Sequence, residues 1–314
     1  MDAQKTPGAS NSKRPKSGRK LLVVADDFGI GPGTSTGILD LAQKGVLTST
    51  VLLVNSPYAE AGVAAWHADG RPMEMGWHPN LTLDKPMLPP GEVPSLVGPD
   101  GGFWPLGVFL KRVILGRIKT HEVEREWRAQ YERFIALVGR PPTIINSHQH
   151  VALFPTLGIV LLNILKDQRP RPYVRRVREP WSMLWIISGA RKKRAFLNLL
   201  GGRMSRWQEW AGFPGNDWLA GVTDPPWVRR NDFFRTWLSR VPGNVVELAC
   251  HPGHHDDTLI GRDCTRADGL LQRRVDEWRL LNQADFLETV AEAGFAIVQP
   301  HSRSSEGTRS LHAA

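Results

Sequence analysis

Four short segments place ionisable side chains at the ends of predicted strands. Their sequences are A-D-D-F-G at 25–29, G-W-H-P-N at 76–80, N-S-H-Q-H at 146–150 and A-C-H-P-G at 249–253. In a barrel of parallel strands the carboxyl ends meet on one face, so side chains far apart in the sequence come together there. We therefore expect one site that contains Asp26, Asp27, His78, His148 and His251.

The chemistry of this set suits one divalent metal ion. Two neutral imidazoles and one carboxylate leave coordination positions open for water and a substrate oxygen, and they accept Zn²⁺, Mn²⁺, Co²⁺ or Ni²⁺. Asp26 and Asp27 are adjacent, and two carboxylates at so short a distance repel each other unless a cation binds one of them. The pattern predicts one aspartate as metal ligand and the other as base.

Each segment also has a structural interpretation when it is taken alone. An Asp pair after a strand often forms a turn or caps a helix, and a single histidine at a strand end is commonly just hydrogen-bonded. In the H-x-H of His148 and His150 both side chains face the same way, so one of them can lie behind the other. The occurrence of all four segments together favours the functional interpretation.

Glycines between 29 and 37 could suggest a phosphate-binding loop, but the segment has no G-K-[ST] motif and two carboxylates precede it. Carboxylates at that point would repel a phosphate, so a nucleotide site is not expected.

Short apolar runs alternate with helical patterns, which is typical of repeated βα units around a mostly parallel sheet. We predict strands at 21–25, 47–55, 73–77, 143–147, 173–177, 244–250 and 295–298, with a weak one at 218–222. The predicted helices are a stripe that begins at Ile38 and the segments 58–68, 109–115, 122–138, 156–166, 232–241 and 283–293. Seven or eight strands, each followed by a helix, favour an α/β fold with a closed or nearly closed barrel. The loop 84–105, rich in proline and glycine, is expected to be a lid or a binding wall.

The net charge of +9 is concentrated in two places. Residues 1–20 are expected to be a disordered basic tail, 21–300 a single barrel domain and 301–314 a second disordered tail. A basic block at 171–209 could attract an acidic substrate, a membrane surface or nucleic acid, or be a plain solvated face. No RRM, KH or helix-turn-helix pattern is present, so nucleic acid is not expected as a partner. Two cysteines make no disulfide framework, and no signal sequence or membrane span is recognisable, which points to the cytoplasm.

The ordered set of motifs resembles the YdjC-like carbohydrate deacetylases, which include the chitooligosaccharide deacetylases. The resemblance covers 21–300 and rests on A-D-D-F-G, G-V-L-T-S-T at 45–50, G-W-H-P-N-L-T, N-S-H-Q-H-V and C-H-P-G. It implies a distorted TIM-like barrel and an enzyme that removes acetyl groups from N-acetylglucosamine units with a divalent metal such as Mg²⁺ or Zn²⁺.

Carried over position by position, the resemblance implies metal ligation by Asp27, His78 and His148. Asp26 matches the general base and His251 a histidine that can act as general acid. Arg175 matches an arginine that lines the site. Two positions depart from the family pattern: Asn146 replaces a usual aspartate, and Ala152 replaces a frequent histidine.

Sugars stack on aromatic rings, so Trp77 and Trp104 are candidate substrate contacts, together with Asn80, His150 and Arg175. The run 181–187 followed by the cations 191–194 resembles an amphipathic membrane-surface element, which makes a lipid-linked amino sugar a candidate substrate. The alternatives are a metal-dependent hydrolase of another bond, such as a phosphoester, and a catalytically altered barrel that binds glycans. A homodimer, the sugar chain length and the physiological metal stay open.

Overall fold

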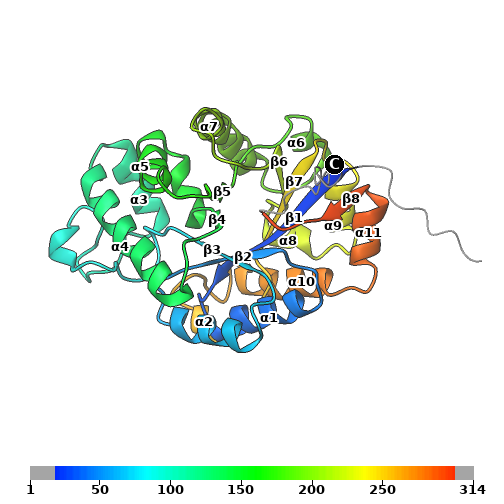
Figure 1. Ribbon diagram of the computed structural model, residues 1–314, viewed down its shortest axis with the longest axis horizontal. Helices are drawn as coiled ribbons and strands as arrows, with labels where there is room; N and C mark the ends of the chain where they lie inside the picture. The colour runs from blue at the N-terminus through cyan, green and yellow to red at the C-terminus, as the bar shows by residue number, and fades with distance from the viewer. Residues whose placement is uncertain (1–17, 301–314) are drawn as a thin grey trace, which may run out of the picture.

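The computed structural model describes residues 18–300, which form one curled, all-parallel sheet surrounded by helices (Figure 1). The strands are β1 (Arg19–Phe28), β2 (Ser49–Leu52), β3 (Glu74–Trp77), β4 (Ile144–Ile145), β5 (Tyr173–Val174), β6 (Trp218–Ala220), β7 (Val245–Cys250) and β8 (Phe295–Ile297). Their order is β5-β4-β3-β2-β1-β7-β6, and β8 pairs with the first residues of β1. The architecture is that of a distorted TIM-like barrel, as the sequence predicts.

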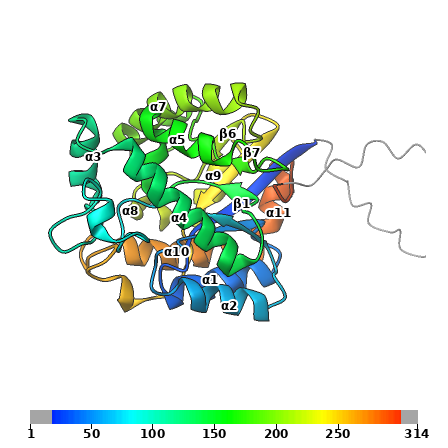
Figure 2. The same ribbon diagram turned by 60° about the vertical axis from the view of Figure 1, so that its left-hand side comes forward.

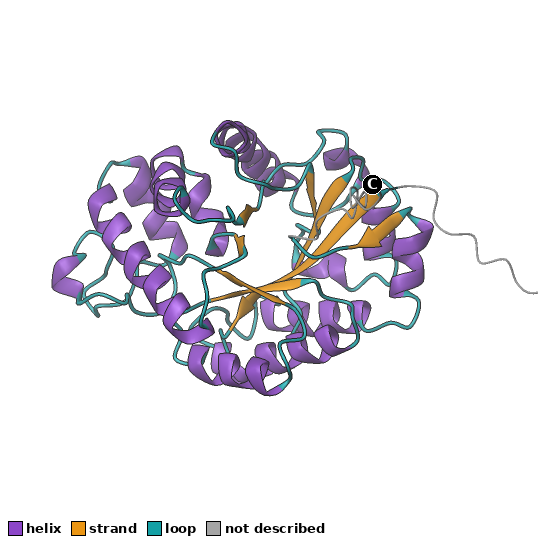
Figure 3. Ribbon diagram, viewed as in Figure 1, coloured by secondary structure: helices purple, strands orange, loops and turns teal. Residues whose placement is uncertain are grey.

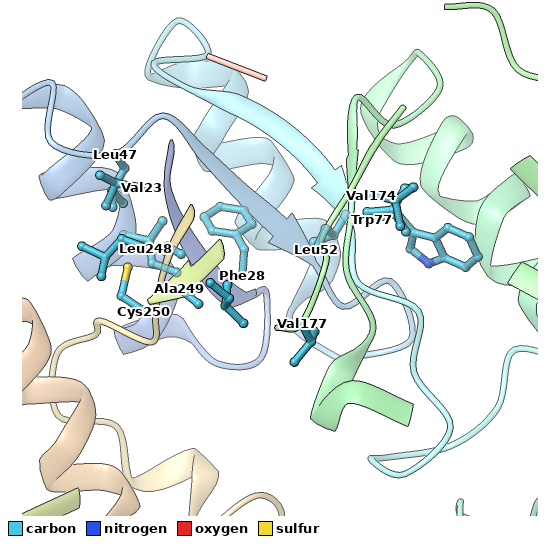
Figure 4. Close-up of a cluster of buried hydrophobic side chains, with 14 of the residues drawn as sticks. Val23, Phe28, Leu47, Leu52, Trp77, Val174, Val177, Leu248, Ala249 and Cys250 are labelled. Carbon is cyan, nitrogen blue, oxygen red and sulfur yellow. The ribbon is translucent and has the colours of Figure 1, made fainter. Parts of the chain in front are cut away.

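The long central strand β1 separates two layers of apolar side chains. Leu22 and Val24 join a small cluster with Val51, Ile144 and Tyr173, which fills the inside of the barrel. The alternate residues of β1 belong to the large core between the sheet and the helices, part of which is drawn in Figure 4. Because side chains alternate along a strand, each strand residue can be assigned to the inside or the outside of the barrel.

Helices cover the outer face of the sheet (Figure 3). They are α1 (Pro32–Gln43), α2 (Ala59–Ala68), α3 (Leu106–Ile114), α4 (Thr120–Val138), α5 (Pro155–Leu165), α6 (Met183–Ile186), α7 (Arg191–Trp210), α8 (Pro225–Val228), α9 (Phe233–Leu238), α10 (Leu270–Leu281) and α11 (Phe286–Glu292). Short 3₁₀ segments are η1 (Pro90–Glu92), η2 (His148–Leu153) and η3 (Asp257–Leu259). No helix within 18–300 is long and apolar enough to cross a membrane.

The two edge strands, β5 and β6, are not paired with each other, so the ring of strand pairing is open between them. The buried side chain of Asn216 bridges this seam. Its Oδ1 accepts hydrogen bonds from the Arg176 main-chain N–H at 2.8 Å and the Tyr173 hydroxyl at 3.1 Å, and its Nδ2 donates to the Arg176 carbonyl at 2.8 Å. Side-chain and loop contacts therefore replace a regular ladder at this point.

Every predicted strand is present, including the weak one near 218, although most are shorter than expected. Four helices were not predicted, namely α6, α7, α8 and α10. A helix that packs on a hydrophobic core usually has an apolar stripe along one face. In α7 and α10 cationic side chains interrupt this stripe, and several of those cations are buried. The α7 segment therefore looked like part of a solvated basic block, and the α10 segment gave no recognisable helical pattern.

The first strand begins at Arg19, inside the segment that was expected to be a tail. The Arg19 guanidinium donates to the carbonyls of Val241, Gly243 and Ala293 and lies over the Phe295 ring, 3.9 Å from its centroid. These contacts fix the start of β1. The rest of the expected basic tail and the expected tail after 300 lie outside the described residues.

The loop 84–105 packs against α4 rather than over the strand ends. Buried carboxylates of α4 accept its main-chain N–H groups: Glu126 accepts from Met87 and Leu88 at 2.9 and 3.0 Å, and Glu122 accepts from Ser95 at 2.7 Å. No residue of the loop lines the main cavity described below, so the structure gives it no role as a wall of that cavity.

Replacing Asn216 with alanine removes the bridge across the seam and leaves the Arg176 main-chain N–H buried without its partner. We expect the free energy of unfolding to fall by about 2–4 kcal/mol, measured by urea denaturation. Asn244→Ala is the control, because Asn244 is exposed and its side chain makes no hydrogen bond among residues 18–300; a change below about 0.5 kcal/mol is expected there. Equal effects of the two substitutions would contradict the role of Asn216.

Candidate metal centre and its cavity

The backbone of β1 is irregular where its two aspartates lie. Pairing with β2 runs from Ala25 opposite Thr50 to Phe28 opposite Leu52, so β1 carries one extra residue, and Asp27 has a left-handed φ of 67°. In a regular strand Asp26 would continue the inward series of Leu22 and Val24, and Asp27 would point outward. A bulge changes the direction of the bulged side chain, and here both carboxylates line the same cavity.

Three potential metal ligands converge at this cavity. The Asp27 Oδ1 atom lies 3.0 Å from His148 Nδ1 and 3.2 Å from His78 Nε2, and the two imidazole nitrogens are 3.4 Å apart. All three residues are buried. They form the one group of His, Cys, Asp and Glu side chains within 18–300 whose geometry could hold a metal ion.

The neighbours of these three side chains fit a cation. The His78 Nδ1 atom lies 2.7 Å from the Asn146 carbonyl, which makes Nδ1 the proton donor and leaves a lone pair on Nε2. Burial lowers the pKa of His148, but the hydrogen bond and charge of Asp27 outweigh it and leave this pKa raised. The site thus favours a positive charge between Asp27 and the imidazoles, which a divalent metal would supply.

Arg274 of α10 holds the other oxygen of Asp27. Its Nη2 atom donates to Asp27 Oδ2 at 2.7 Å and to Asp263 Oδ2 at 2.9 Å. Burial alone would raise the pKa of Asp27, but Arg274 and the hydrogen bonds with the two histidines keep it well below the ordinary value. Asp27 therefore presents one ionised oxygen, Oδ1, to the imidazoles.

Asp26 has a separate cationic partner. Arg175, which follows β5, donates to both carboxylate oxygens of Asp26 at 2.6 and 2.8 Å and also to Glu247 on β7. Burial acts to raise the pKa of Asp26, but Arg175 outweighs it and lowers this pKa to about 2. Asp26 is therefore an ionised carboxylate at neutral pH.

His251, directly after β7, lies on the other side of Asp26, with its Nε2 atom 3.8 Å from Asp26 Oδ2. Its Nδ1 atom faces Arg273 Nη2 at 3.4 Å and Glu277 Oε2 at 3.9 Å. Burial and then the charge of Arg273 lower the pKa of His251 to about 4. The imidazole is therefore neutral at pH 7.

A cavity of about 480 Å³ opens above these groups. Its floor includes Asp26, Asp27, His78, His148 and His251, so the structure brings together the five side chains that the sequence assigns to one site. Its other lining residues come from helices α3, α7 and α10, the η2 segment and the loops around them.

The remaining candidates for substrate contact differ in whether they line the cavity. His150 lines the cavity, and burial followed by the charge of Arg175 lowers its pKa well below the ordinary value. Arg175 reaches the site only through Asp26 and is not a lining residue.

Trp77, Asn80 and Trp104 are not among the residues that line the cavity. Trp77 is buried on the outer side of β3 and packs edge-on against Tyr131, with ring centroids 5.6 Å apart (Figure 4). The Asn80 side chain bonds the main chain of 82 and 83, which shapes the turn after β3. The Trp104 indole donates to the Ser95 carbonyl at 3.2 Å and lies under Arg112.

Several charged residues beside the floor were not predicted. These are Asp263 and the α10 residues Arg273, Arg274 and Glu277, together with Glu247 on β7. Three of them, Asp263, Arg273 and Arg274, line the cavity. The Glu247 position had a usable signal, because a carboxylate in the middle of the apolar strand 245–250 must find a buried cation. The α10 residues had none, because that helix was not recognised.

The two departures from the family pattern have different surroundings. The Asn146 Nδ2 atom donates to Asp26 Oδ1 at 3.2 Å, so this residue contributes a hydrogen bond rather than a second negative charge beside the carboxylate. Ala152 lies in η2, where its main-chain N–H donates to Ser147 Oγ at 3.0 Å, and it does not line the cavity.

The model of the YdjC-like protein family matches residues 20–292. Chitooligosaccharide deacetylases of Yersinia pestis (strain Pestoides F) and Yersinia pseudotuberculosis serotype O:1b (strain IP 31758) are each 29% identical over 280 residues, which is 88% of this chain and 97% of theirs. A crystal structure of an Enterococcus faecalis V583 protein, described as a cellobiose-phosphate cleavage protein, superimposes with a TM-score of 0.69 at 25% identity. The match covers 90% of this chain and 98% of the other.

The family match covers β1 from its second residue and all of β2 to β7, but not β8. It includes every residue of the cavity floor. The resemblance inferred from the four motifs is thereby confirmed, and the chain belongs to the YdjC-like family.

Proposed function

We propose that the protein is a metal-dependent carbohydrate N-deacetylase that removes the acetyl group from an N-acetylglucosamine-containing substrate. The observation that carries the proposal is the convergence of Asp27, His78 and His148 beside an ionised Asp26 at the floor of a cavity. The relatives named chitooligosaccharide deacetylases support an amide-bond hydrolase that acts on amino sugars.

Asp27, His78 and His148 would hold the metal. When bound, a divalent ion supplies Lewis acidity that polarises an amide carbonyl and lowers the pKa of a water molecule. One carboxylate with two imidazoles accepts Zn²⁺, Mn²⁺ or Co²⁺, and Mg²⁺ is the further candidate. Arg274 and the Asn146 carbonyl orient Asp27 and His78, so the ligand atoms are fixed before a metal binds.

Asp26 is the general base of the proposal. Its carboxylate lies next to the ligand set and accepts a proton from water during attack on the amide carbon. Arg175 fixes both oxygens and keeps the group ionised, and Asn146 adds a further hydrogen bond. These contacts hold the base in one orientation over a wide range of pH.

His251 is the proton donor to the departing amine. Because its imidazole is neutral at pH 7, it must first gain a proton, and the proton taken up by Asp26 is within reach across the 3.8 Å between Oδ2 and Nε2. Movement of this proton from Asp26 to His251 and then to the amine supplies the leaving group with the hydrogen it needs. His150, which shares the cavity, is placed to contact the substrate.

A phosphoester hydrolase would be expected to use two metal ions with several bridging carboxylates. Residues 18–300 contain one group of side chains that could hold a metal ion, with one carboxylate in it, so this alternative has less support. A cytoplasmic location and a homodimer remain predictions from the sequence.

The first test is acetate release from metal-stripped protein after Zn²⁺, Mg²⁺, Mn²⁺ or Co²⁺ is added back, with N-acetylglucosamine, chitobiose and longer chitooligosaccharides as substrates. We expect acetate only in the presence of metal, and none from His148→Ala, which loses one of three ligands. Metal content measured by mass spectrometry should fall in the same variant. Bound metal without acetate from any N-acetylated sugar, soluble or lipid-linked, would exclude the deacetylase.

The base is tested with Asp26→Asn, which keeps the shape and one oxygen that accepts from Arg175 but cannot accept a proton. We expect kcat to fall by about 10²–10⁴-fold while the metal content stays at the wild-type level. Asp167→Asn, an exposed aspartate, is the matched control and should leave kcat unchanged. Full activity of Asp26→Asn would assign the base to another group.

The neutral state of His251 makes the stability of the metal-free protein depend on pH. Between pH 6.5 and about 4 the unfolded chain binds a proton that the folded site excludes, so the free energy of unfolding falls as the pH is lowered through this window. His251→Gln lacks this contribution and should lose less stability than wild type between about pH 7 and pH 5. Urea denaturation of both metal-free proteins at the two pH values measures the free energy of unfolding. Equal losses in the two proteins would contradict a lowered pKa of His251 in the folded state.

A further inference from the structure

One wall of the cavity is almost wholly apolar. Leu106 and Leu110 of α3 line it, as do Leu153 at the end of η2 and Phe154 after it. The α7 helix adds Phe196, Leu197 and Leu200. A free oligosaccharide presents hydroxyl groups on all sides and needs hydrogen-bonding partners, whereas aliphatic side chains offer it none. The wall therefore fits a hydrocarbon group attached to the sugar better than further sugar units.

Apolar side chains continue from this wall onto the outer surface. We define the rim patch as Trp181, Trp185, Ile186, Phe196 and Leu199, which lie on α7, on the short α6 segment before it and, for Trp181, in the turn before α6. The exposed fraction is 78% for Trp185, 66% for Leu199 and 58% for Trp181. Phe196 belongs to both surfaces, because it lines the cavity and is 49% exposed. Phe196 thus links the rim patch to the cavity wall.

Cations border the rim patch at a place where helix stability does not explain them. Arg191, Lys192 and Lys193 occupy the first turn of α7, where the helix dipole disfavours positive charge. All three are exposed. Lys192 makes no hydrogen bond or ion pair within the described residues, and the acidic charge that acts on Lys193 is that of Asp224. An external anionic partner would offset this concentration of charge.

The fold brings these features to one region of the molecule. The Arg191 side chain donates to the Leu184 carbonyl at 3.0 Å, which ties the first turn of α7 to α6. Figure 1 shows α6 next to α7, and Figure 2 shows α3 and α7, the two helices whose residues line the apolar wall. Lys193 and Phe196 thus line the cavity itself, and the other cations and rim-patch residues lie on the same helix or on the segment just before it.

We propose that the rim patch and the α7 cations dock this protein on the surface of an anionic lipid bilayer, with the cavity mouth facing the lipid. It follows, resting on the proposed function, that the substrate is an N-acetylated sugar whose other end is a hydrocarbon group. Indole and aliphatic side chains enter the interfacial layer while lysines meet lipid phosphates, which is the combination found here. The exposed aliphatic residues have no role in binding a nucleic acid, and the cations without ion pairs have none in an apolar protein interface. The combination therefore favours a lipid surface.

The docking surface is tested by co-sedimentation with vesicles of phosphatidylcholine that contain about 30% phosphatidylglycerol, and with pure phosphatidylcholine vesicles. Wild type should bind the anionic vesicles and release at high salt. The double variant Trp185→Ser, Lys192→Glu should partition about tenfold or more weakly, because it loses an interfacial indole and reverses one charge. Neither residue lines the cavity, so acetate release from a soluble substrate should not change.

Trp210→Ser is the matched control. Trp210 is 91% exposed, but it lies at the other end of α7, roughly 27 Å along the helix from Lys192. It should bind vesicles as wild type does. The basic residues before Gly18 are present in all three proteins and cancel in the comparison. Equal binding of wild type and the double variant, or no binding of wild type at low salt, would overturn the docking proposal.

The substrate class is tested separately with two N-acetylglucosaminides, one with a dodecyl group presented in the anionic vesicles and one with a methyl group in solution. We expect kcat/KM to be at least about tenfold higher for the dodecyl glycoside. The double variant should lose this preference and keep its rate on the methyl glycoside. Similar kcat/KM values for both glycosides would contradict the proposal of a substrate with a hydrocarbon group. Vesicle binding without acetate from either glycoside would support the docking surface but reject the proposed deacetylase activity.

Discussion

Two buried carboxylates on neighbouring residues are the constraint on which the site depends. Asp26 and Asp27 are removed from water, and each would be driven to take up a proton unless a positive charge lay against it. Two separate arginines supply these positive charges. Arg175, after β5, pairs with Asp26, and Arg274 of α10 pairs with Asp27. This division keeps both groups ionised and gives them different surroundings. One faces two imidazoles, and the other faces His251.

The same constraint explains why distant parts of the chain must be correctly folded before the site exists. Arg175 is itself buried and needs Glu247 on β7 as a second counter-charge. Arg274 is positioned by a helix near the end of the chain and also pairs with Asp263. Removing one partner of such a pair leaves a buried charge uncompensated, which typically costs 3–5 kcal/mol. The charge network and the barrel therefore form one cooperative unit.

Much of the site was predictable because strand geometry is regular. The residues His78 and His148 follow predicted strands, and the convergence of parallel strand ends places them together. The same alternation argues against Trp77 as a sugar platform, since the neighbour of an inward histidine points outward; the sequence contained this signal. The direction of Asp27 was not predictable in this way, because it depends on a bulge that the local sequence does not announce.

The helices α7 and α10 could not be recognised from periodicity. Arg194 of α7 is buried beside Glu179, and Arg274 of α10 is buried beside Asp27, so charged residues that suggest a solvated surface are part of the packing. Such pairing is a tertiary property and is absent from any window of the sequence. For that reason the convergence of the side chains at the cavity floor was predicted, while the wall and the supporting charges were not.

The open seam between β5 and β6 has a consequence for how this fold can diversify. The segment that carries α6 and α7 lies between these two strands, so changes in its length or composition interrupt no strand ladder. In the candidate metal centre Asp27 lies on β1, His78 directly follows β3 and His148 begins η2 after β4, so all three belong to the continuous part of the sheet. Substrate recognition can thus be exchanged as a module at the seam, while the chemistry is inherited unchanged with the rest of the barrel.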